Sequence, residues 1–163
     1  MLPTIGSGDG GKVLAVNSDE DGMEWVGLSI ISNNGTIVFN NESNKNGVVT
    51  SNEISESGIY LVSSYIEIPY QIYQGTITGY AFGTALSSSD SSASDVISNQ
   101  WFFGGGNFTN LTEPIRTLST RILKVDLAAN PTYNKLITRY NIETSSTLTG
   151  SITSRTQILK IGV

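Results

Sequence analysis

The sequence predicts an all-β fold: an antiparallel two-sheet jelly-roll sandwich, trimeric, with a short N-terminal β-hairpin arm. The first observation behind this fold class is the composition. Of the 163 residues, 38% are hydrophobic and only 14% are charged, while Ser, Thr, Asn and Gly are abundant between the apolar segments. This profile is typical of strands joined by turns, because a helical bundle needs more Ala, Glu, Lys and Leu at helical spacing. The second observation is one long segment that is apolar on both faces.

That segment is residues 58–68, which begin at a glycine and are closed by Pro69. Its β-branched, aromatic and small polar residues predict a single strand. One face would carry Tyr60, Val62, Ser64, Ile66 and Ile68, and the other Ile59, Leu61, Ser63, Tyr65 and Glu67. Since neither face is polar, we expect this strand inside a sandwich, or between a sheet and a second subunit.

The N-terminal residues 1–26 predict a small hairpin. Two apolar segments, Val13–Val16 and Met23–Val26, flank a turn at 17–22 that is rich in residues tolerating left-handed conformations. A two-stranded hairpin is too small to be stable alone, so its apolar residues need a host surface. These residues are Leu2, Ile5, Val13, Leu14, Val16 and Trp25.

The remaining strands follow in order between turn signals. A short strand is predicted at 36–39, followed by a polar loop at 40–47. Beyond the central strand, further strands are predicted at 71–86, 101–103, 118–128, 135–143 and 157–163, with an exposed Ser/Asp loop at 87–94. Roughly eight strands separated by turns predict a two-sheet sandwich or jelly roll.

Two of these strands have informative faces. In 71–86, small residues recur at every second position, Gly79, Ala81 and Gly83 among them, so a large ring or another backbone can approach closely. In 118–128, Leu123, Val125 and Leu127 are predicted inside. In 135–143, alternation predicts Leu136, Thr138, Tyr140 and Ile142 inside, and Ile137, Arg139, Asn141 and Glu143 largely outside.

Charge and residue types exclude several classes of function. The net charge is −5 and no basic cluster occurs, which argues against nucleic acid as a partner. The chain has no Cys and no His, so disulfides, thiolate metal sites and the commonest general base are absent. No apolar run is long enough to span a bilayer and no secretion leader is evident. We expect a non-enzymatic protein without a cofactor or a membrane partner.

Three motifs point weakly to chemistry. Residues 6–12 match the start of a phosphate-binding loop, but Val13 replaces the magnesium-binding hydroxyl and a strand follows, which favours a glycine turn. Residues 17–22 match the start of a calcium loop, whose closing carboxylate would fall on Leu28, which favours a hairpin turn. Asp90, Asp95 and Glu113 are the only candidates for a paired-carboxylate hydrolase, and solvated acids are the simpler interpretation.

The N-terminal segment carries a resemblance. Leu-Pro at 2–3, Gly-Asp-Gly-Gly-Lys-Val-Leu-Ala-Val-Asn at 8–17, an acidic-Gly turn and Glu-Trp-Val at 24–26 resemble a module of tailed-bacteriophage virion proteins. Tail fibres, head fibres and capsid-decoration proteins carry segments of this type. The likeness covers about 25 residues. It implies a virion structural role without specifying the part of the virion.

The order of elements is similar to the tumour-necrosis-factor-like trimeric jelly roll. The carriers are Gly-Ile-Tyr-Leu-Val-Ser at 58–63 and an aliphatic strand at the C-terminus. The resemblance implies a homotrimer with aromatic residues at the subunit interface. The candidates are Tyr60, Tyr65, Tyr73, Tyr80, Phe102 and Phe103. The open alternative is that these rings fill the core of a single chain.

Together these observations predict an attachment arm at 1–26 and a jelly-roll domain at 27–163 of a phage protein that is made in the host cytoplasm and sits on the virion surface. As a capsid-decoration, cement or head-fibre protein it would bind the major capsid protein or another virion protein through its arm. The alternative is a tail-fibre tip that binds a host receptor or glycan, with Trp101, Phe102, Phe103 and Phe108 as a stacking surface. Because the module begins at residue 2, we expect the first. A bacterial sugar-binding or matrix protein is a third possibility.

Overall fold

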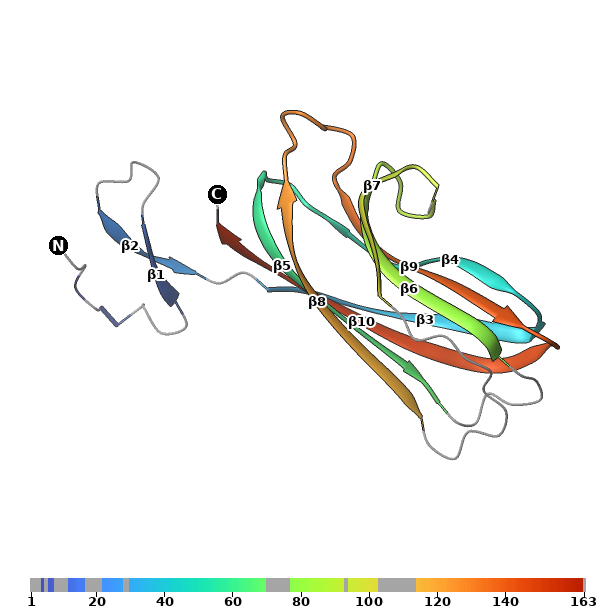
Figure 1. Cartoon of the computed structure of the whole chain (residues 1–163). Helices are drawn as coiled ribbons and strands as arrows, with labels where there is room; N and C mark the ends of the chain where they lie inside the picture. Colours follow the sequence, from blue (N-terminus) through green and yellow to red (C-terminus); the bar gives the residue numbers. More distant parts are fainter. Residues whose placement is uncertain are drawn as a thin grey trace.

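A computed structural model describes residues 4, 6–7, 12–16, 22–27, 30–69, 77–92, 94–102 and 114–162. Ten strands cover most of this part of the chain, and it contains no helix. The all-β prediction is confirmed. The strands form one two-stranded sheet and two four-stranded sheets that pack face to face as a sandwich (Figure 1).

The first four-stranded sheet has the order β3-β10-β5-β8, and the second has the order β4-β9-β6-β7. The first contains β3 (Ile30–Glu42), β10 (Leu148–Gly162), β5 (Gly58–Ile68) and β8 (Ile115–Val125). The second contains β4 (Lys45–Glu53), β9 (Lys135–Thr144), β6 (Ile77–Ser87) and β7 (Val96–Phe102). We refer to them as the first sheet and the second sheet.

The pairing is nested, which identifies a jelly roll. β3 pairs with β10, β4 with β9, β5 with β8 and β6 with β7, all antiparallel. The eight strands are therefore one long antiparallel ribbon whose successive pairs alternate between the two sheets, as in an eight-stranded jelly roll. The contacts of β10 with β5 and of β9 with β6 complete each sheet.

The central strand lies where the sequence placed it. β5 is an interior strand between β10 and β8, and its burial alternates residue by residue along its whole length. Its Tyr60 face is buried in the sandwich, while its Tyr65 face is half-buried on the outside of the first sheet.

The core consists of two apolar clusters with a polar layer between them. The first cluster includes Phe39, Ile66, Phe82 and Ile142, and the second includes Ile54, Val62, Leu136 and Ile158. Between the clusters, inward-facing Ser, Thr and Asn side chains line up across both sheets. The polar layer comprises Asn33, Thr156, Ser64 and Ser119 from the first sheet, and Thr50, Thr138 and Thr84 from the second.

One threonine of the polar layer links the two sheets. The Thr156 hydroxyl lies 2.6 Å from the Thr138 hydroxyl and 3.0 Å from the Thr50 hydroxyl, and all three residues are buried. A buried hydroxyl that loses its partner is costly, so this contact fixes how β10 faces β9 and β4.

One strand was not predicted, and two others begin earlier than predicted. β4 was missed and occupies part of the predicted loop at 40–47, β3 begins at residue 30 instead of 36, and β10 begins at residue 148 instead of 157. These segments are rich in Ser, Thr and Asn, and pairing with neighbouring strands outweighs their low apolar content. The predicted loop shrinks to a tight turn in which Asn41 and Asn44 adopt positive φ.

The outward-facing residues Ile137 and Arg139 of β9 are buried, which corrects their predicted exposure. Their exposed fractions are 0% and 7%. The loop after β6 lies over this outer face of the second sheet. Its Asp90 accepts a 2.6 Å hydrogen bond from Ser51, which is the residue of β4 paired with Ile137. The ring of Trp101 covers Arg139, with the guanidinium carbon 4.0 Å from the ring centroid.

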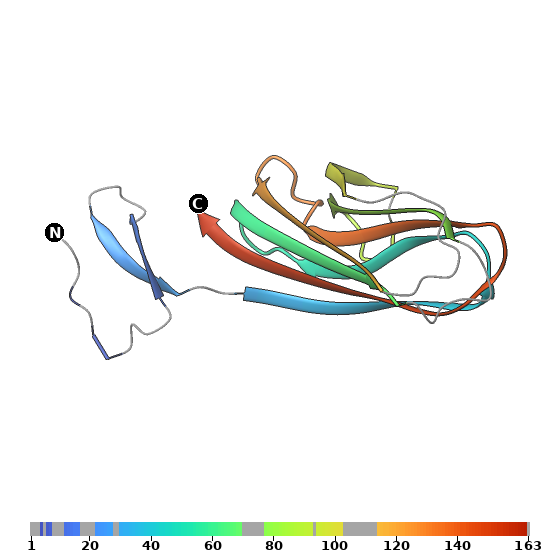
Figure 2. The ribbon, with the colours of Figure 1, turned by 60° about the horizontal axis from the view of Figure 1, so that its bottom comes forward.

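The N-terminal hairpin is formed by β1 (Lys12–Val16) and β2 (Met23–Gly27), which pair only with each other among the described strands. Its register places Leu14 opposite Trp25 and Val16 opposite Met23, as the predicted turn requires. The hairpin lies beyond the end of the sandwich at which β10 finishes (Figures 1 and 2). We call it the arm.

We expect Thr156→Val to lower the free energy of unfolding by about 1–3 kcal/mol, because the buried Thr50 and Thr138 hydroxyls lose their shared partner. Urea denaturation followed by circular dichroism measures this change. Thr153→Val on the exposed face of the same strand is the matched control and should change stability little. Equal effects of the two substitutions would contradict a structural role for the polar layer.

Candidate functional site

The aromatic residues predicted at a subunit interface fall in different places. Tyr60 and Tyr80 are 5% and 8% exposed and belong to the core of the single chain. The Tyr60 hydroxyl donates to the Glu56 carbonyl at 2.8 Å. Phe102 is half-buried against the first cluster. Only Tyr65 lies on an outer face, whereas Tyr73 and Phe103 lie outside the described residues.

The predicted attachment residues belong to the arm as far as they are described. Leu14 is half-buried on β1, and Met23 on β2, which pairs with Val16, is 37% exposed. The backbones of Val13, Val16 and Trp25 pair within the hairpin. The side chains of these three residues, and Leu2 and Ile5, lie outside the described part.

The predicted close approach on β6 is confirmed at Gly83. Gly83 pairs with Trp101 on one side and with Arg139 on the other. A Cβ atom at Gly83 would lie 2.9 Å from the Trp101 ring and 2.6 Å from the Gln100 carbonyl oxygen. The glycine thus allows the indole to cross β6 and stack on the guanidinium of Arg139. This arrangement makes Trp101 part of the covering of the second sheet, and its ring remains 37% exposed.

The acidic residues considered for hydrolysis are engaged in loop contacts. Asp95 accepts hydrogen bonds from Ser88 and from Tyr133, the latter at 2.7 Å, and these contacts lower its pKa. Asp90 accepts from Ser51, and Glu113 lies outside the described residues. Most of the 6–12 and 17–22 motifs also lies outside them. Among the described residues, no group of three metal-ligating side chains occurs and no helix is long and apolar enough to cross a membrane.

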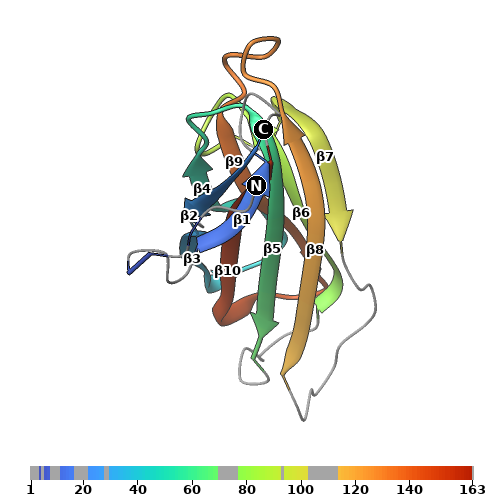
Figure 3. The same cartoon turned by 90° about the vertical axis from the view of Figure 1, so that its left-hand side faces the viewer.

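A partly buried arginine joins the two sheets along one side of the sandwich. β7 and β8 are the edge strands on this side (Figure 3). The Arg121 guanidinium of β8 donates to the Ser98 carbonyl of β7 at 2.7 Å, and Ser98 has a positive φ of 49°. Burial lowers the Arg121 pKa to about 10. The contact closes this side of the sandwich without a carboxylate partner among the described residues.

The outer face of the first sheet carries an apolar row that crosses all four strands. Leu159 of β10 pairs with Ile30 of β3 and with Leu61 of β5, and Leu61 pairs with Ile122 of β8. Ile30 and Ile122 are 59% and 68% exposed. We call these four residues the apolar row. The alternation of β5 pointed to an apolar outer face, but only the register across the sheet aligns these residues.

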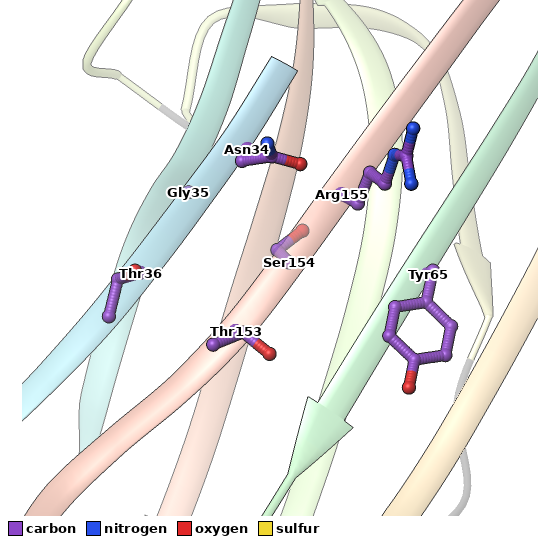
Figure 4. A pocket seen from close by; sticks show the side chains of 7 residues that line it. All are labelled: Asn34, Gly35, Thr36, Tyr65, Thr153, Ser154 and Arg155. Carbon is purple, nitrogen blue, oxygen red and sulfur yellow. The ribbon is translucent and has the colours of Figure 1, made fainter. Parts of the chain in front are cut away.

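The next row along the same face is polar and consists of Ser32, Gln157, Ser63 and Thr120. Two residue positions further along β10, the face has a depression of about 310 Å³. Arg155 of β10 pairs with Asn34 of β3 and with Tyr65 of β5, and Thr153 pairs with Thr36. These side chains form the walls, and Gly35 and Ser154, which lie between them on the strands, complete the lining (Figure 4).

The ring of Tyr65 is held by a charged pair. Its hydroxyl donates to the Glu67 carboxylate at 2.5 Å, and Arg116 Nε donates to the same oxygen at 2.9 Å. The pKa of Glu67 is lowered most by the hydrogen bond from Tyr65 and next by the one from Arg116. The hydrogen bond to Glu67 raises the pKa of Tyr65. The phenol is therefore fixed at one end, and Figure 4 shows its ring face-on from outside the first sheet.

Comparison with known proteins finds structural likeness only. No protein-family profile and no curated protein matches the chain. A structure of infectious bursal disease virus, Gx strain, aligns over 93% of this chain with 10% identity and a TM-score of 0.46. The VP2 subviral particle of infectious bursal disease virus aligns over 93% with 8% identity and a TM-score of 0.34. The chain spans 37% and 42% of those two chains, and likeness at this level does not establish a common function.

We expect Tyr65→Phe to raise the pKa of Glu67 toward its ordinary value, because the phenol makes the largest contribution to lowering it. A lowered carboxyl pKa stabilises the folded state above that pKa, and the stabilisation disappears as the pH falls through it. An NMR titration of the Glu67 carboxyl measures the change. Glu56, whose pKa is lowered by Lys160, is the internal control and should not move. An unchanged Glu67 pKa would show that the phenol contact is absent in solution.

Proposed function

We propose that the chain is a non-enzymatic structural protein of a bacteriophage particle, held on the virion surface through its arm. The observation that supports this proposal most strongly is the hairpin. β1 and β2 pair only with each other among the described strands, and a two-stranded sheet of this size needs another surface for stability. The same segment bears the residues that resemble phage virion modules.

The jelly roll is compatible with this proposal without requiring it, because eight-stranded jelly rolls occur in virus capsids, lectins and cupins alike. The arm favours attachment: it extends beyond the sandwich and leaves both outer sheet faces clear of the attachment point (Figure 2). The partner is the major capsid protein or another virion protein, and the role is that of a decoration, cement or head-fibre protein.

We further propose that the jelly roll forms a homotrimer through the apolar row. Ile30 and Ile122 expose most of their side chains at opposite edges of the first sheet, with Leu159 and Leu61 between them. A continuous aliphatic row across an open sheet face is unusual on a monomer. A second copy is the occupant, because a chain without Cys has no disulfides and gains stability from subunit contacts.

Removing residues 1–27 should abolish attachment to the particle and leave the sandwich folded, since β3 begins only at Ile30. The measurement is binding of fluorescently labelled protein to capsids stripped of their surface proteins, with host cells as the second arm. Circular dichroism checks the fold of the truncated chain.

The matched control is Val38→Ser, which changes an exposed apolar residue far along β3 from the arm and should bind capsids normally. Normal capsid binding by the truncated protein would place attachment elsewhere. Saturable binding of the full chain to cells and not to capsids would instead favour a receptor-binding tip.

Multi-angle light scattering at micromolar concentration should give the mass of three chains. Ile122→Asp should shift this mass to one chain, because a carboxylate in the apolar row loses its hydration when copies associate. Val38→Asp, an exposed apolar position outside the row, is the control and should remain trimeric. A monomeric wild-type protein would end the proposal, and a trimer that tolerates Ile122→Asp would move the interface away from the row.

A further inference from the structure

The depression on the first sheet offers polar groups that the protein itself does not use. Asn34, Thr36, Thr153 and Arg155 make no hydrogen bond or ion pair through their side chains within the described part of the chain. They come from two neighbouring strands and face the same space (Figure 4). An amide, two hydroxyls and a guanidinium together provide donors and acceptors for a ligand rich in hydroxyl groups.

Tyr65 provides the apolar part of the same site. Its hydroxyl is anchored by Glu67, which is in turn anchored by Arg116, so the ring keeps its position without a ligand. An aromatic face that is fixed in advance costs little entropy on binding. The flat ring beside hydroxyl and amide groups suits a ligand with one apolar face and a polar edge, which is the shape of a sugar ring.

The charge of the depression selects among sugars. Among the described residues, Arg155 is the only charged residue of the lining. The Glu67 carboxylate, paired across from Thr153, accepts hydrogen bonds from Tyr65 and Arg116 through one of its oxygens. A guanidinium without a protein partner can bind a carboxylate through two parallel hydrogen bonds. The local charge is therefore positive, although the chain carries −5 overall.

We propose that this depression binds an acidic polysaccharide, with the ring of one acidic sugar residue against Tyr65 and its carboxylate on Arg155. Hydroxyl groups of that residue and of the next one along the polysaccharide lie toward Thr153, Asn34 and Thr36. The depression opens to solvent on the outer face of the sheet, so the polysaccharide can continue beyond it. It lies apart from the arm and from the apolar row. Attachment to the particle and binding of the sugar can therefore succeed or fail independently.

The test is an NMR titration of the full-length protein with a short oligosaccharide of galacturonic acid, with a galactose oligosaccharide of the same length as the neutral arm. We expect saturable shifts for residues of the depression with the acidic oligosaccharide and much weaker binding of the neutral one. Tyr65→Ala should abolish binding. Arg155→Gln should lower the affinity for the acidic oligosaccharide by about tenfold or more, since the substitution removes a charge-assisted bidentate contact.

Two control variants separate this site from general attraction of anions. Lys124→Gln removes an exposed cation from β8 of the same sheet, outside the depression, and should leave the affinity unchanged. Tyr65→Phe keeps the ring but removes its anchor on Glu67, so it should weaken binding less than Tyr65→Ala does, and circular dichroism of both variants checks that each is folded. Three results would overturn the proposal: no saturable binding of the acidic oligosaccharide, binding that survives Tyr65→Ala, or equal affinity for the neutral oligosaccharide.

Discussion

The contact of Thr156 with Thr138 and Thr50 is the constraint on which the arrangement of both sheets depends. It joins β10 of the first sheet to β9 and β4 of the second, between two apolar clusters that have no directional preference of their own. Aliphatic clusters alone would tolerate small sliding of one sheet over the other. Hydrogen-bonded hydroxyls in the core do not tolerate such sliding, because each would lose its hydrogen bond when the sheets are displaced.

The same contact determines what the outer face presents. Side chains alternate along a strand, so an inward Thr156 places Arg155 and Gln157 outward. Thr156 pairs with Ser64, which places Tyr65 outward beside Arg155. The polar layer inside the sandwich and the polar depression outside it thus occupy neighbouring positions on the same strands. A shift of one residue in β10 would move the hydroxyl side chain of Ser154 or Thr156 into the place of the guanidinium.

Sequence patterns predicted the elements whose alternation is strong and missed those whose residues are polar. The central strand was predictable because neither of its faces is polar, and β8 and β9 were predictable because apolar residues mark one face of each. β4 and the first half of β10 were not, since their Ser and Thr residues resemble those of loops until strand pairing is known. Ile137 and Arg139 were expected outside because alternation cannot show that a loop and the Trp101 ring cover that face. The small residues of β6 predicted that a ring or a backbone approaches Gly83 closely, but they did not identify Trp101 as that ring.

The candidate site was the least predictable feature, and the reason is physical. Asn34, Tyr65 and Arg155 are separated by 31 and 90 positions in sequence and meet only through the register of β3, β10 and β5. No local motif encodes such a meeting. Of the aromatic residues that stood out in the sequence, Tyr65 lines the depression, whereas Tyr60 and Tyr80 are inside the core. A residue stands out in a sequence because of its type. Whether its side chain can reach a ligand depends on which face of the sheet it occupies, and strand pairing determines that face.

The first sheet can serve association and ligand binding together because its outer face changes character along the strands. At the end nearest the arm the face carries the apolar row, with the exposed Lys124 two positions beyond Ile122 on β8, and copies that pack on the row itself bury Ile30 and Ile122. Beyond the row of Ser, Thr and Gln the face mixes polar groups with the exposed Leu118 and Val38, and Arg155 would lose its hydration if a copy covered it without supplying a carboxylate. Burial of the apolar row is therefore favourable while burial of the depression is not. This difference limits how far a neighbouring copy extends over the sheet and leaves the depression open to solvent.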